Sequence, residues 1–325
     1  MGTKRMKDEA AIVGVGATPY YRRGESLPLT ETELACRAIL SAVDDAGLTI
    51  RDVDGFALYS APIDPAEIAA ILGIPEVRFS ATLTSGGGGS AGSLGLAAAA
   101  VATGQAECVI SVMTLQQAAR RLGGTRESGG SVGGALSSGG PYSSGGIPPV
   151  LGFIANAGMA SPGHSFSILT QRHMHQYGTT REHFAHVAIN QRDFAMTRPT
   201  ALRTEPLTMD DYFNSRMISD PLCLLDYTME SDGAVAVVVT SADRAKDLRH
   251  PPVYIMGSAH GGMGRWSTAI FTWFQQPDDY FASSGHRPVA KRMYDMAGVT
   301  AADVDVALLY DHFGPMVLMQ LEDYG

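Results

Sequence analysis

The sequence AGLTIRDVDGFALY at residues 46–59 returns 251 residues later as AGVTAADVDVALLY at residues 297–310. Eight of the fourteen positions are identical, and the alignment needs no gap. Each copy follows an amphipathic helix pattern, at residues 34–45 and 288–296, and runs into an apolar segment typical of a strand. A helix–turn–strand unit reused at this distance predicts two related halves rather than a short-period solenoid.

The bulk composition describes an ordinary globular protein. The chain has 325 residues, of which 45% are hydrophobic and 18% charged, and this length allows about two domains. Its net charge of −9 argues against nucleic acid or an anionic membrane as a partner. The charged N-terminus has no signal-peptide apolar region behind it, and no stretch approaches the roughly 18 apolar residues of a membrane helix. Cys36, Cys108 and Cys223 are scattered, so no disulfide framework is expected and the predicted location is cytoplasmic.

Strand and helix patterns alternate along the chain, which is typical of an α/β fold. Residues 123–163 interrupt this rhythm with Gly, Ser and Pro clusters, and a segment of this length is expected to be a functional loop, a lid or disorder. Strands are predicted at residues 11–16, 53–59, 77–83, 107–113, 233–240, 252–257 and 304–310, and helices at 30–46, 65–72, 92–103, 165–177, from 181, from 207 and at 288–296.

The two predicted halves are unequal. Residues 1–249 form the N-terminal half, with a loop insertion at about 123–215, and residues 250–325 form the C-terminal half. The first half contains five predicted strands and the second only two. A sheet with so few strands would expose a face and an edge, so we expect the second half to be incomplete at the C-terminus.

Four blocks in order along the chain carry a family resemblance. They are GSLGLAAAAVATGQA (92–106), QYGTTREHFAHVAINQRDFA (176–195), SRMISDPLCLLDYTMESDGAVAVVV (215–239) and VDVALLYDHFGPMVLMQLEDYG (304–325). The first is similar to the nucleophile helix of the thiolase superfamily, and the second to the segment after the loop insertion in sterol-carrier-protein-type thiolases. The last two resemble signatures of the two thiolase halves. The resemblance implies two related α/β halves in a layered α-β-α-β-α arrangement, with the second half incomplete.

The chain departs from the thiolase pattern at the nucleophile. Thiolases carry a cysteine at the N-terminus of the helix that here starts near Ser90, because a helix end stabilises a thiolate. The corresponding positions are Gly86, Gly87, Gly88 and Gly89. Glycines leave room for a ligand, and their N–H groups favour a developing anion on a substrate oxygen. A flexible linker is the other interpretation of this run.

Cysteine-free thiolase relatives with the YDHF stretch found at residues 310–313 resemble the side-chain-cleaving aldolases of steroid-degrading bacteria. The resemblance implies retro-aldol cleavage of a β-hydroxyacyl-CoA with a steroid-like acyl group, giving a ketone and a short acyl-CoA. Coenzyme A is then part of the substrate, and no further cofactor or metal is expected. The resemblance also implies a homodimer joined between Val77 and Leu83, and a small partner protein with an OB-fold and a zinc ribbon.

Retro-aldol cleavage needs a base for the hydroxyl proton and hydrogen-bond donors to the thioester oxygen. Tyr310 ends the predicted second-half strand, where thiolases carry a polar active-site residue, and its phenol is the expected proton carrier. Asp311 and His312 adjoin it and are expected to assist. Because strand residues alternate, Tyr310 and His312 are predicted to project together and Asp311 away from them. Core packing is the alternative role for Tyr310, because its repeat counterpart is Tyr59.

Three further residues are candidates for binding the substrate. Tyr227 stands where the related signature often has cysteine, Ser90 begins the predicted nucleophile helix, and His260 precedes two glycines in SAHGGMG. His173 and His175 are two residues apart on a predicted helix, so their side chains diverge and predict no metal site.

Two other functions stay open on the sequence. The first is a Claisen-type acyltransferase that uses an unrecognised cysteine, although Cys36, Cys108 and Cys223 are all expected to be small core residues. The second is a non-catalytic scaffold that binds acyl-CoA or activates a partner. The sequence does not specify the exact acyl group.

Overall fold

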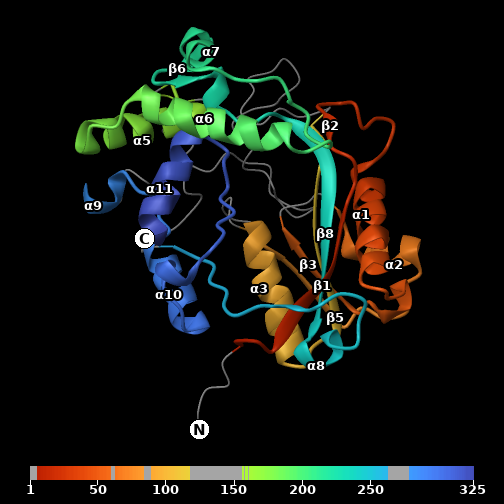
Figure 1. Ribbon diagram of the computed structural model, residues 1–325. Helices are drawn as coiled ribbons and strands as arrows, with labels where there is room; N and C mark the ends of the chain where they lie inside the picture. The colour runs from red at the N-terminus through yellow and green to blue at the C-terminus, as the bar shows by residue number, and fades with distance from the viewer. Residues whose placement is uncertain are drawn as a thin grey trace.

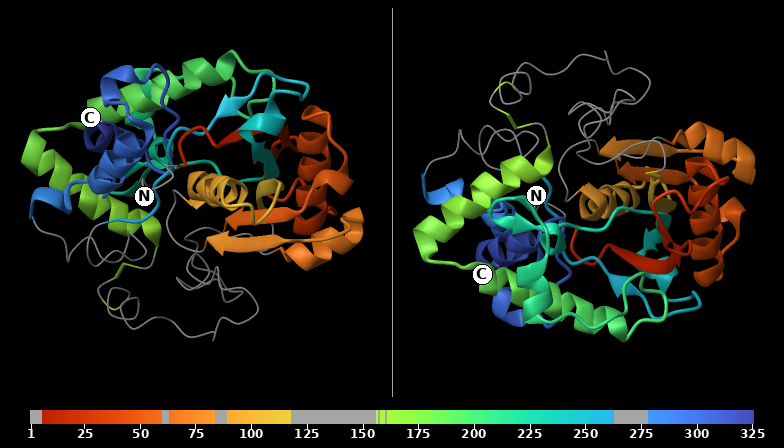
Figure 2. Two further views of the ribbon diagram at one scale, coloured as in Figure 1. Left: turned by 90° about the horizontal axis from the view of Figure 1, so that it is seen from below. Right: turned by 90° about the horizontal axis from the view of Figure 1, so that it is seen from above.

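A computed structural model describes residues 6–59, 63–83, 89–117, 156, 158–159, 161–262 and 278–325 of the 325-residue chain. One large mixed sheet organises this part of the chain and has helices on both faces (Figure 1). A second group of helices gathers beside it. Helix α3 (Gly89–Ala102) lies between this group and the sheet in all the views (Figures 1 and 2).

The main sheet contains seven strands, which are β1 Ala10–Ala17, β2 Tyr21–Arg22, β3 Gly55–Tyr59, β4 Phe79–Leu83, β5 Cys108–Leu115, β8 Ser231–Ser241 and β9 Val253–Tyr254. Their spatial order is β4-β3-β5-β8-β1-β9, with β2 paired to β8 outside this row. β3 is parallel to β4 and β5, whereas β8 is antiparallel to β5 and β1. Parallel neighbours need crossover connections, which α2 (Pro65–Leu72) and α3 supply.

Helices α1 (Glu31–Asp45) and α2 cover one face of the sheet, and α3 covers the other (Figure 1). α1 begins where the Thr30 side chain accepts a hydrogen bond from the N–H of Glu33. α1 buries Leu34 and Ile39 against one face of the sheet. The opposite face of the sheet packs on the alanine-rich side of α3. The sheet is therefore buried on both faces where these helices cross it.

Apart from the short helix α8, which packs against β1 and β8, the remaining helices form a separate group around α11. α11 packs against both α6 and α10, and Phe184 and Tyr212 form a small core of their own between α6 and α7. Of the helices described, none is long and apolar enough to cross a bilayer. The elements outside the main sheet are α5 Pro162–Tyr177, α6 Arg181–Met196, α7 Met209–Asn214, β6 Met217–Ser219, β7 Leu222–Cys223, α8 Ala242–Ala245, α9 Asp278–Phe281, α10 Arg287–Ala297 and α11 Gly314–Tyr324.

Most predicted elements are present where the sequence patterns place them. α2 is confirmed residue for residue, and α3, α5 and α7 differ from their predicted starts by two or three residues. β9 is shorter than the predicted strand at 252–257, because only Val253 and Tyr254 pair with β1. The predicted boundary between residues 249 and 250 stays a prediction.

The two copies of the repeat share one local structure. In each copy a glycine with φ of +71° follows the helix, and a threonine hydroxyl then donates to an aspartate carboxylate three residues on, at 2.7 and 2.8 Å. The residues are Gly47, Thr49 and Asp52 in the first copy and Gly298, Thr300 and Asp303 in the second. The turn is therefore encoded by the local sequence in both places.

The strand predicted at residues 304–310 is absent from the described structure, and that prediction is wrong. Its counterpart β3 lies between β4 and β5, which satisfy its backbone on both sides. Residues 304–310 have no such neighbours among those described, and Val306 and Leu308 are 77% and 96% exposed. The same pattern forms a strand only where adjacent strands complete it.

Asp54 joins β3 to β5, and its repeat counterpart Asp305 offers a matched control. The Asp54 carboxylate accepts hydrogen bonds from the N–H groups of Glu107 and Cys108 at 2.8–3.0 Å, whereas Asp305 makes none within the described chain. We expect Asp54→Ala to lower the free energy of unfolding by about 2 kcal/mol, because two amides lose a charged acceptor. Asp305→Ala should change it by less than about 0.5 kcal/mol. Urea denaturation measures both, and equal losses would contradict the assignment.

Candidate active site

The aromatic rings of Tyr310 and His312 stack on one side of the segment that leads into α11. Their centroids lie 4.5 Å apart, with 21° between the ring planes. Asp311 points elsewhere, and its carboxylate accepts a hydrogen bond from the Gln191 side chain of α6 at 3.0 Å. The predicted alternation is confirmed, and His312 rather than Asp311 is the immediate neighbour of the Tyr310 ring.

Contacts with residues 227–228 hold this segment in place. The N–H of Thr228 donates to the carbonyl of His312 at 3.2 Å, and Tyr227 and Phe313 form an antiparallel bridge. Residues 227–228 lie just before β8, whereas residues 310–313 lie just before α11. Two short hydrogen-bonded contacts therefore fix the backbone on which the stacked rings stand.

Further aromatic side chains pack around the pair. The ring centroid of Phe166 in α5 lies 4.6 Å from that of His312, edge-on, and 4.5 Å from that of Phe313. The ring centroids of Tyr227 and Phe313 lie 4.8 Å apart. We call Tyr310, His312, Phe166, Phe313 and Tyr227 the aromatic cluster. The Tyr227 hydroxyl is buried without a hydrogen-bond partner in the described chain. Tyr227 thus supports the cluster by packing, and its role in substrate binding stays a prediction.

Gly89 opens α3, and the ring of Tyr59 at the end of β3 lies directly against it. A Cβ on Gly89 would overlap two atoms of that ring. No side chain, cysteine included, fits at position 89 while Tyr59 keeps its place. Gly86, Gly87 and Gly88 lie outside the described residues, and their predicted role stays a prediction.

His260 and Ser258 pack on α3 at Gly92 and Gly95, which follow Gly89 about one and two turns along the helix. A Cβ on Gly92 would lie 2.8 Å from the His260 ring, and a Cβ on Gly95 would overlap the Ser258 hydroxyl. Glycines at three-residue spacing therefore let residues 258–260 lie on the helix backbone. Ser90 is exposed in the first turn of α3, beside Gly89.

The rings of the site are uncharged at neutral pH. Burial, followed by the neighbouring Tyr310 phenol, raises the pKa of Tyr59 to about 12. Tyr310 itself is 49% exposed, yet protein surrounds its phenol closely enough that burial, and then Asp311, raises its pKa. Burial lowers the pKa of His312 to about 4, against the smaller opposing effect of its hydrogen bond to the Tyr310 carbonyl. Both phenols are therefore protonated, and the imidazole is neutral.

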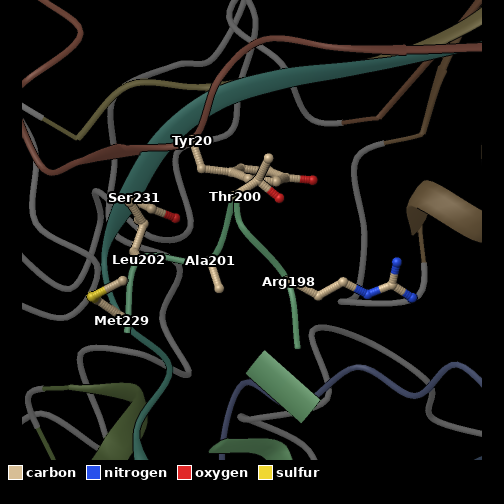
Figure 3. Close-up of a pocket in the computed structure, with 7 residues that line it drawn as sticks. All are labelled: Tyr20, Arg198, Thr200, Ala201, Leu202, Met229 and Ser231. Atoms are coloured by element: carbon tan, nitrogen blue, oxygen red, sulfur yellow. The ribbon is translucent and has the colours of Figure 1, made fainter. Parts of the chain in front are cut away.

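A separate pocket of about 310 Å³ lies between the start of β8 and the loop after α6 (Figure 3). It contains none of the predicted site residues, and its Arg198 side chain extends away from Leu202 and Met229. We therefore assign the candidate site to the aromatic cluster and the start of α3. The pocket is lined by Tyr20, Arg198, Thr200, Ala201, Leu202, Met229 and Ser231.

Tyr59 connects the aromatic cluster to α3, and sequence reasoning missed it as a site residue. Its ring lies on Gly89, and its pKa responds to Tyr310. The repeat is the signal that could have found it, because it pairs Tyr59 with Tyr310. Phe166 has no comparable signal, since only the tertiary packing of α5 brings it to His312.

Known proteins are similar to this chain over nearly all of its length. The family described as thiolase C-terminal domain-like matches residues 271–325. A steroid side-chain-cleaving aldolase of Thermomonospora curvata is 37% identical over 318 residues, which cover 97% of this chain and 77% of the relative. The chain belongs to the thiolase superfamily.

Further relatives place this thiolase-superfamily chain in a lyase branch. The 17-hydroxy-3-oxo-4-pregnene-20-carboxyl-CoA lyase of Mycobacterium tuberculosis is 34% identical over 332 residues, which cover 98% of this chain and 79% of the relative. The solved Ltp2-ChsH2(DUF35) aldolase is 34% identical with a TM-score of 0.85, over 99% of this chain and 78% of that one. The predicted α/β class and thiolase-like fold are confirmed, and the chain is an aldolase, a carbon–carbon lyase, of this superfamily.

All three cysteines of this aldolase are buried in its core, as predicted. Cys36, Cys108 and Cys223 are free thiols, and none is more than 6% exposed. Burial raises the pKa of Cys108 to about 12 and also raises the pKa of Cys36. A buried thiol that resists ionisation is a poor nucleophile, so Cys36 and Cys108 give no support to covalent acyl transfer.

We expect Gly89→Ala to displace the Tyr59 ring, because the added methyl group would overlap it. Overpacking of this kind costs about 1–3 kcal/mol, so the free energy of unfolding should fall by that amount. In a Tyr59→Ala chain the overlap is gone, and the same Gly89→Ala change should cost less than about 0.5 kcal/mol. Chemical denaturation of the four proteins measures this difference. The same loss in both backgrounds would show that the ring contact is not the cause.

Proposed function

We propose that this aldolase cleaves a β-hydroxyacyl-CoA by a retro-aldol reaction that gives a ketone and a shorter acyl-CoA. The observation that carries the proposal is the Tyr59 ring on Gly89, where a nucleophile would otherwise stand. Without covalent acyl transfer, the available chemistry is proton transfer and anion stabilisation. Tyr310 and His312, stacked on each other, supply groups for both, and Tyr310 is close enough to Tyr59 to contribute to the rise of its pKa.

The proton movements of the reaction match the two stacked rings. The substrate loses its β-hydroxyl proton, the bond between the α and β carbons breaks, and its electron pair forms an enolate on the thioester. The α carbon then takes up a proton. His312 is neutral because its pKa is about 4, and it accepts the hydroxyl proton. Tyr310 is protonated because its pKa is raised, and it donates its proton to the α carbon of the enolate. Return of a proton from His312 to Tyr310 restores both groups.

The first turn of α3 is the proposed site for the thioester oxygen, where the enolate charge collects. The first N–H groups of a helix have no partner within it and favour an anion. Gly89 and Ser90 occupy this turn, and glycine allows a ligand to approach the backbone closely. Gly86, Gly87 and Gly88 precede them and belong to the same proposal.

A steroid-like acyl group is proposed for the substrate. The M. tuberculosis relative is named for 17-hydroxy-3-oxo-4-pregnene-20-carboxyl-CoA, whose hydroxyl group is β to its thioester. In this chain, the rings of Phe166 and Phe313 offer apolar surface beside His312. Coenzyme A is part of this substrate, and the proposed chemistry needs no other cofactor.

A homodimer and a partner protein are also proposed. β4 is the edge strand of the main sheet within the described chain, so the region from Val77 to Leu83 presents an unpaired edge to a second copy. The related aldolase structure is named for Ltp2 together with ChsH2(DUF35). By this resemblance we propose a small partner with an OB-fold and a zinc ribbon.

The direct test incubates a steroid β-hydroxyacyl-CoA with the chain and a DUF35 partner. Liquid chromatography then measures the shorter acyl-CoA that is released. Tyr310→Phe should lower kcat at least about 100-fold, because general acid–base groups contribute 10²–10⁴-fold. Tyr254→Phe, on the exposed part of β9, is the matched control and should keep full activity.

Three outcomes would overturn this proposal. Full activity in a chain carrying both Tyr310→Phe and His312→Ala would remove the mechanism. Inactivation by iodoacetamide with labelling of Cys108 or Cys223 would favour the acyltransferase. Tight binding of acyl-CoA without turnover in any reconstituted mixture would favour a scaffold.

The pH dependence of kcat/KM tests the proton roles. We expect activity to be lost on the acid side with an apparent pKa of about 4, because burial lowers the pKa of His312 and protonation removes the base. On the alkaline side, activity should persist to about pH 10, since the pKa of Tyr310 is raised above the ordinary value near 10. Enzyme kept at pH 7 and diluted into each assay buffer separates titration from unfolding. An acid limb near pH 6.5 would exclude His312 as the buried base.

A further inference from the structure

Residues 304–309 reach the candidate site without strand neighbours in the described chain, yet both the N–H and the carbonyl of Tyr310 are hydrogen-bonded. The Tyr310 N–H donates to Oε1 of Gln320 at 3.3 Å, and Nε2 of Gln320 donates to the Tyr310 carbonyl at 2.7 Å. One carboxamide thus makes the two hydrogen bonds that an adjacent strand would otherwise provide. We propose that Gln320 is the positioning residue that sets the orientation of Tyr310, and this inference deepens the proposed retro-aldol function.

Gln320 is itself rigidly placed. It lies on α11 with only 3% of its surface exposed, and its Nε2 also donates to the Met316 carbonyl one turn back at 2.9 Å. Its neighbours Met316 and Met319 are buried in the core that includes Phe313. Because the side chain is packed and makes three hydrogen bonds, it transmits the position of α11 to the backbone of Tyr310.

The far end of α11 is anchored independently of Tyr310. The buried Asp323 carboxylate accepts hydrogen bonds from the Ser283 and Ser284 hydroxyls and from Nε of Arg287, at 2.6–2.9 Å. These bonds tie α11 to Ser283 and Ser284, which precede α10, and to Arg287, its first residue. The helix that carries Gln320 therefore has a fixed place even when the contact with Tyr310 is removed.

The Tyr310 carbonyl that Gln320 holds also contacts the His312 ring. Nδ1 of His312 lies 3.4 Å from the Tyr310 carbonyl oxygen, and a carbonyl can only accept, so the contact requires the proton on Nδ1. Nε2 then carries the lone pair that the proposed base needs. Gln320 fixes this carbonyl and thereby influences both members of the pair through one peptide group.

A carboxamide is the side chain this place requires. It offers one acceptor to the Tyr310 N–H and one donor to the Tyr310 carbonyl, whereas a carboxylate offers acceptors alone. Gln320→Glu would set a buried carboxylate against the carbonyl oxygen. Gln320→Met keeps the approximate volume but loses both hydrogen bonds, so it separates orientation from packing.

The kinetic test is a double-mutant cycle between Gln320→Met and Tyr310→Phe. Gln320→Met should lower kcat roughly tenfold with KM within about twofold, because misplacement of a reacting group costs rate rather than substrate affinity. In the Tyr310→Phe background the same change should lower kcat by less than about twofold, since the phenol it orients is absent. Met319→Leu, in the same buried helix face, is the control for packing and should leave kcat within about twofold in both backgrounds.

An equal loss from Gln320→Met with and without the Tyr310 phenol would overturn the proposal, because it would mark a purely structural role. Gln320→Glu provides a second variant should the methionine chain fail to fold, and the same cycle applies to it. It should lose at least as much kcat as Gln320→Met, and full activity in the Gln320→Glu chain would also overturn the proposal.

Hydrogen exchange tests the inference without any catalysis. The Tyr310 amide should exchange at least roughly tenfold faster in Gln320→Met than in the parent chain, while the amides of α11 stay unchanged. Unchanged exchange at Tyr310 would overturn the positioning role. If the parent chain shows no lyase activity, the proposed function fails, and the exchange result still decides whether Gln320 holds Tyr310.

Discussion

The rest of the site depends on one contact between an aromatic ring and a backbone without a side chain. Because Gly89 has no Cβ, the Tyr59 ring can lie on the first turn of α3, and β3 and α3 approach each other at this point. The contact has a chemical result as well as a structural one. It fills one of the positions, residues 86–89, that the resemblance to thiolases gives to the nucleophile, and it places the protonated phenol ring of Tyr59 on the first turn of α3.

The internal repeat explains why Tyr59 and Tyr310 correspond to each other. In both copies a glycine follows the helix and the chain turns through the same threonine–aspartate pair, so each copy has a tyrosine as the fourteenth residue of the unit. Tyr59 arrives on a strand that is hydrogen-bonded on both sides. Tyr310 arrives on an extended segment and depends on a side chain for its backbone hydrogen bonds. Equal local sequences thus give one rigid tyrosine and one whose placement depends on α11.

Local physics made much of the fold predictable. Helix α2 follows from Asp64, Pro65 and Gly73, which cap, start and end it within the sequence itself. The shared side of Tyr310 and His312 followed from strand-like alternation. The strand at residues 304–310 was predicted wrongly, because pairing depends on neighbours that periodicity does not report. The Gln191 partner of Asp311 and the Gln320 clamp were not predictable either, since each joins elements whose contact is set by tertiary packing.

The neutrality of the stacked rings has a consequence for ionic strength. Coenzyme A substrates are polyanions, and the chain itself carries a net charge of −9, so long-range encounter is sensitive to screening by salt. Tyr310 and His312 present no net charge between their altered pKa values, so added electrolyte has no charge on these two rings to screen. Substrate capture and bond cleavage should therefore respond to electrolyte separately, with capture changing and the chemical step staying constant.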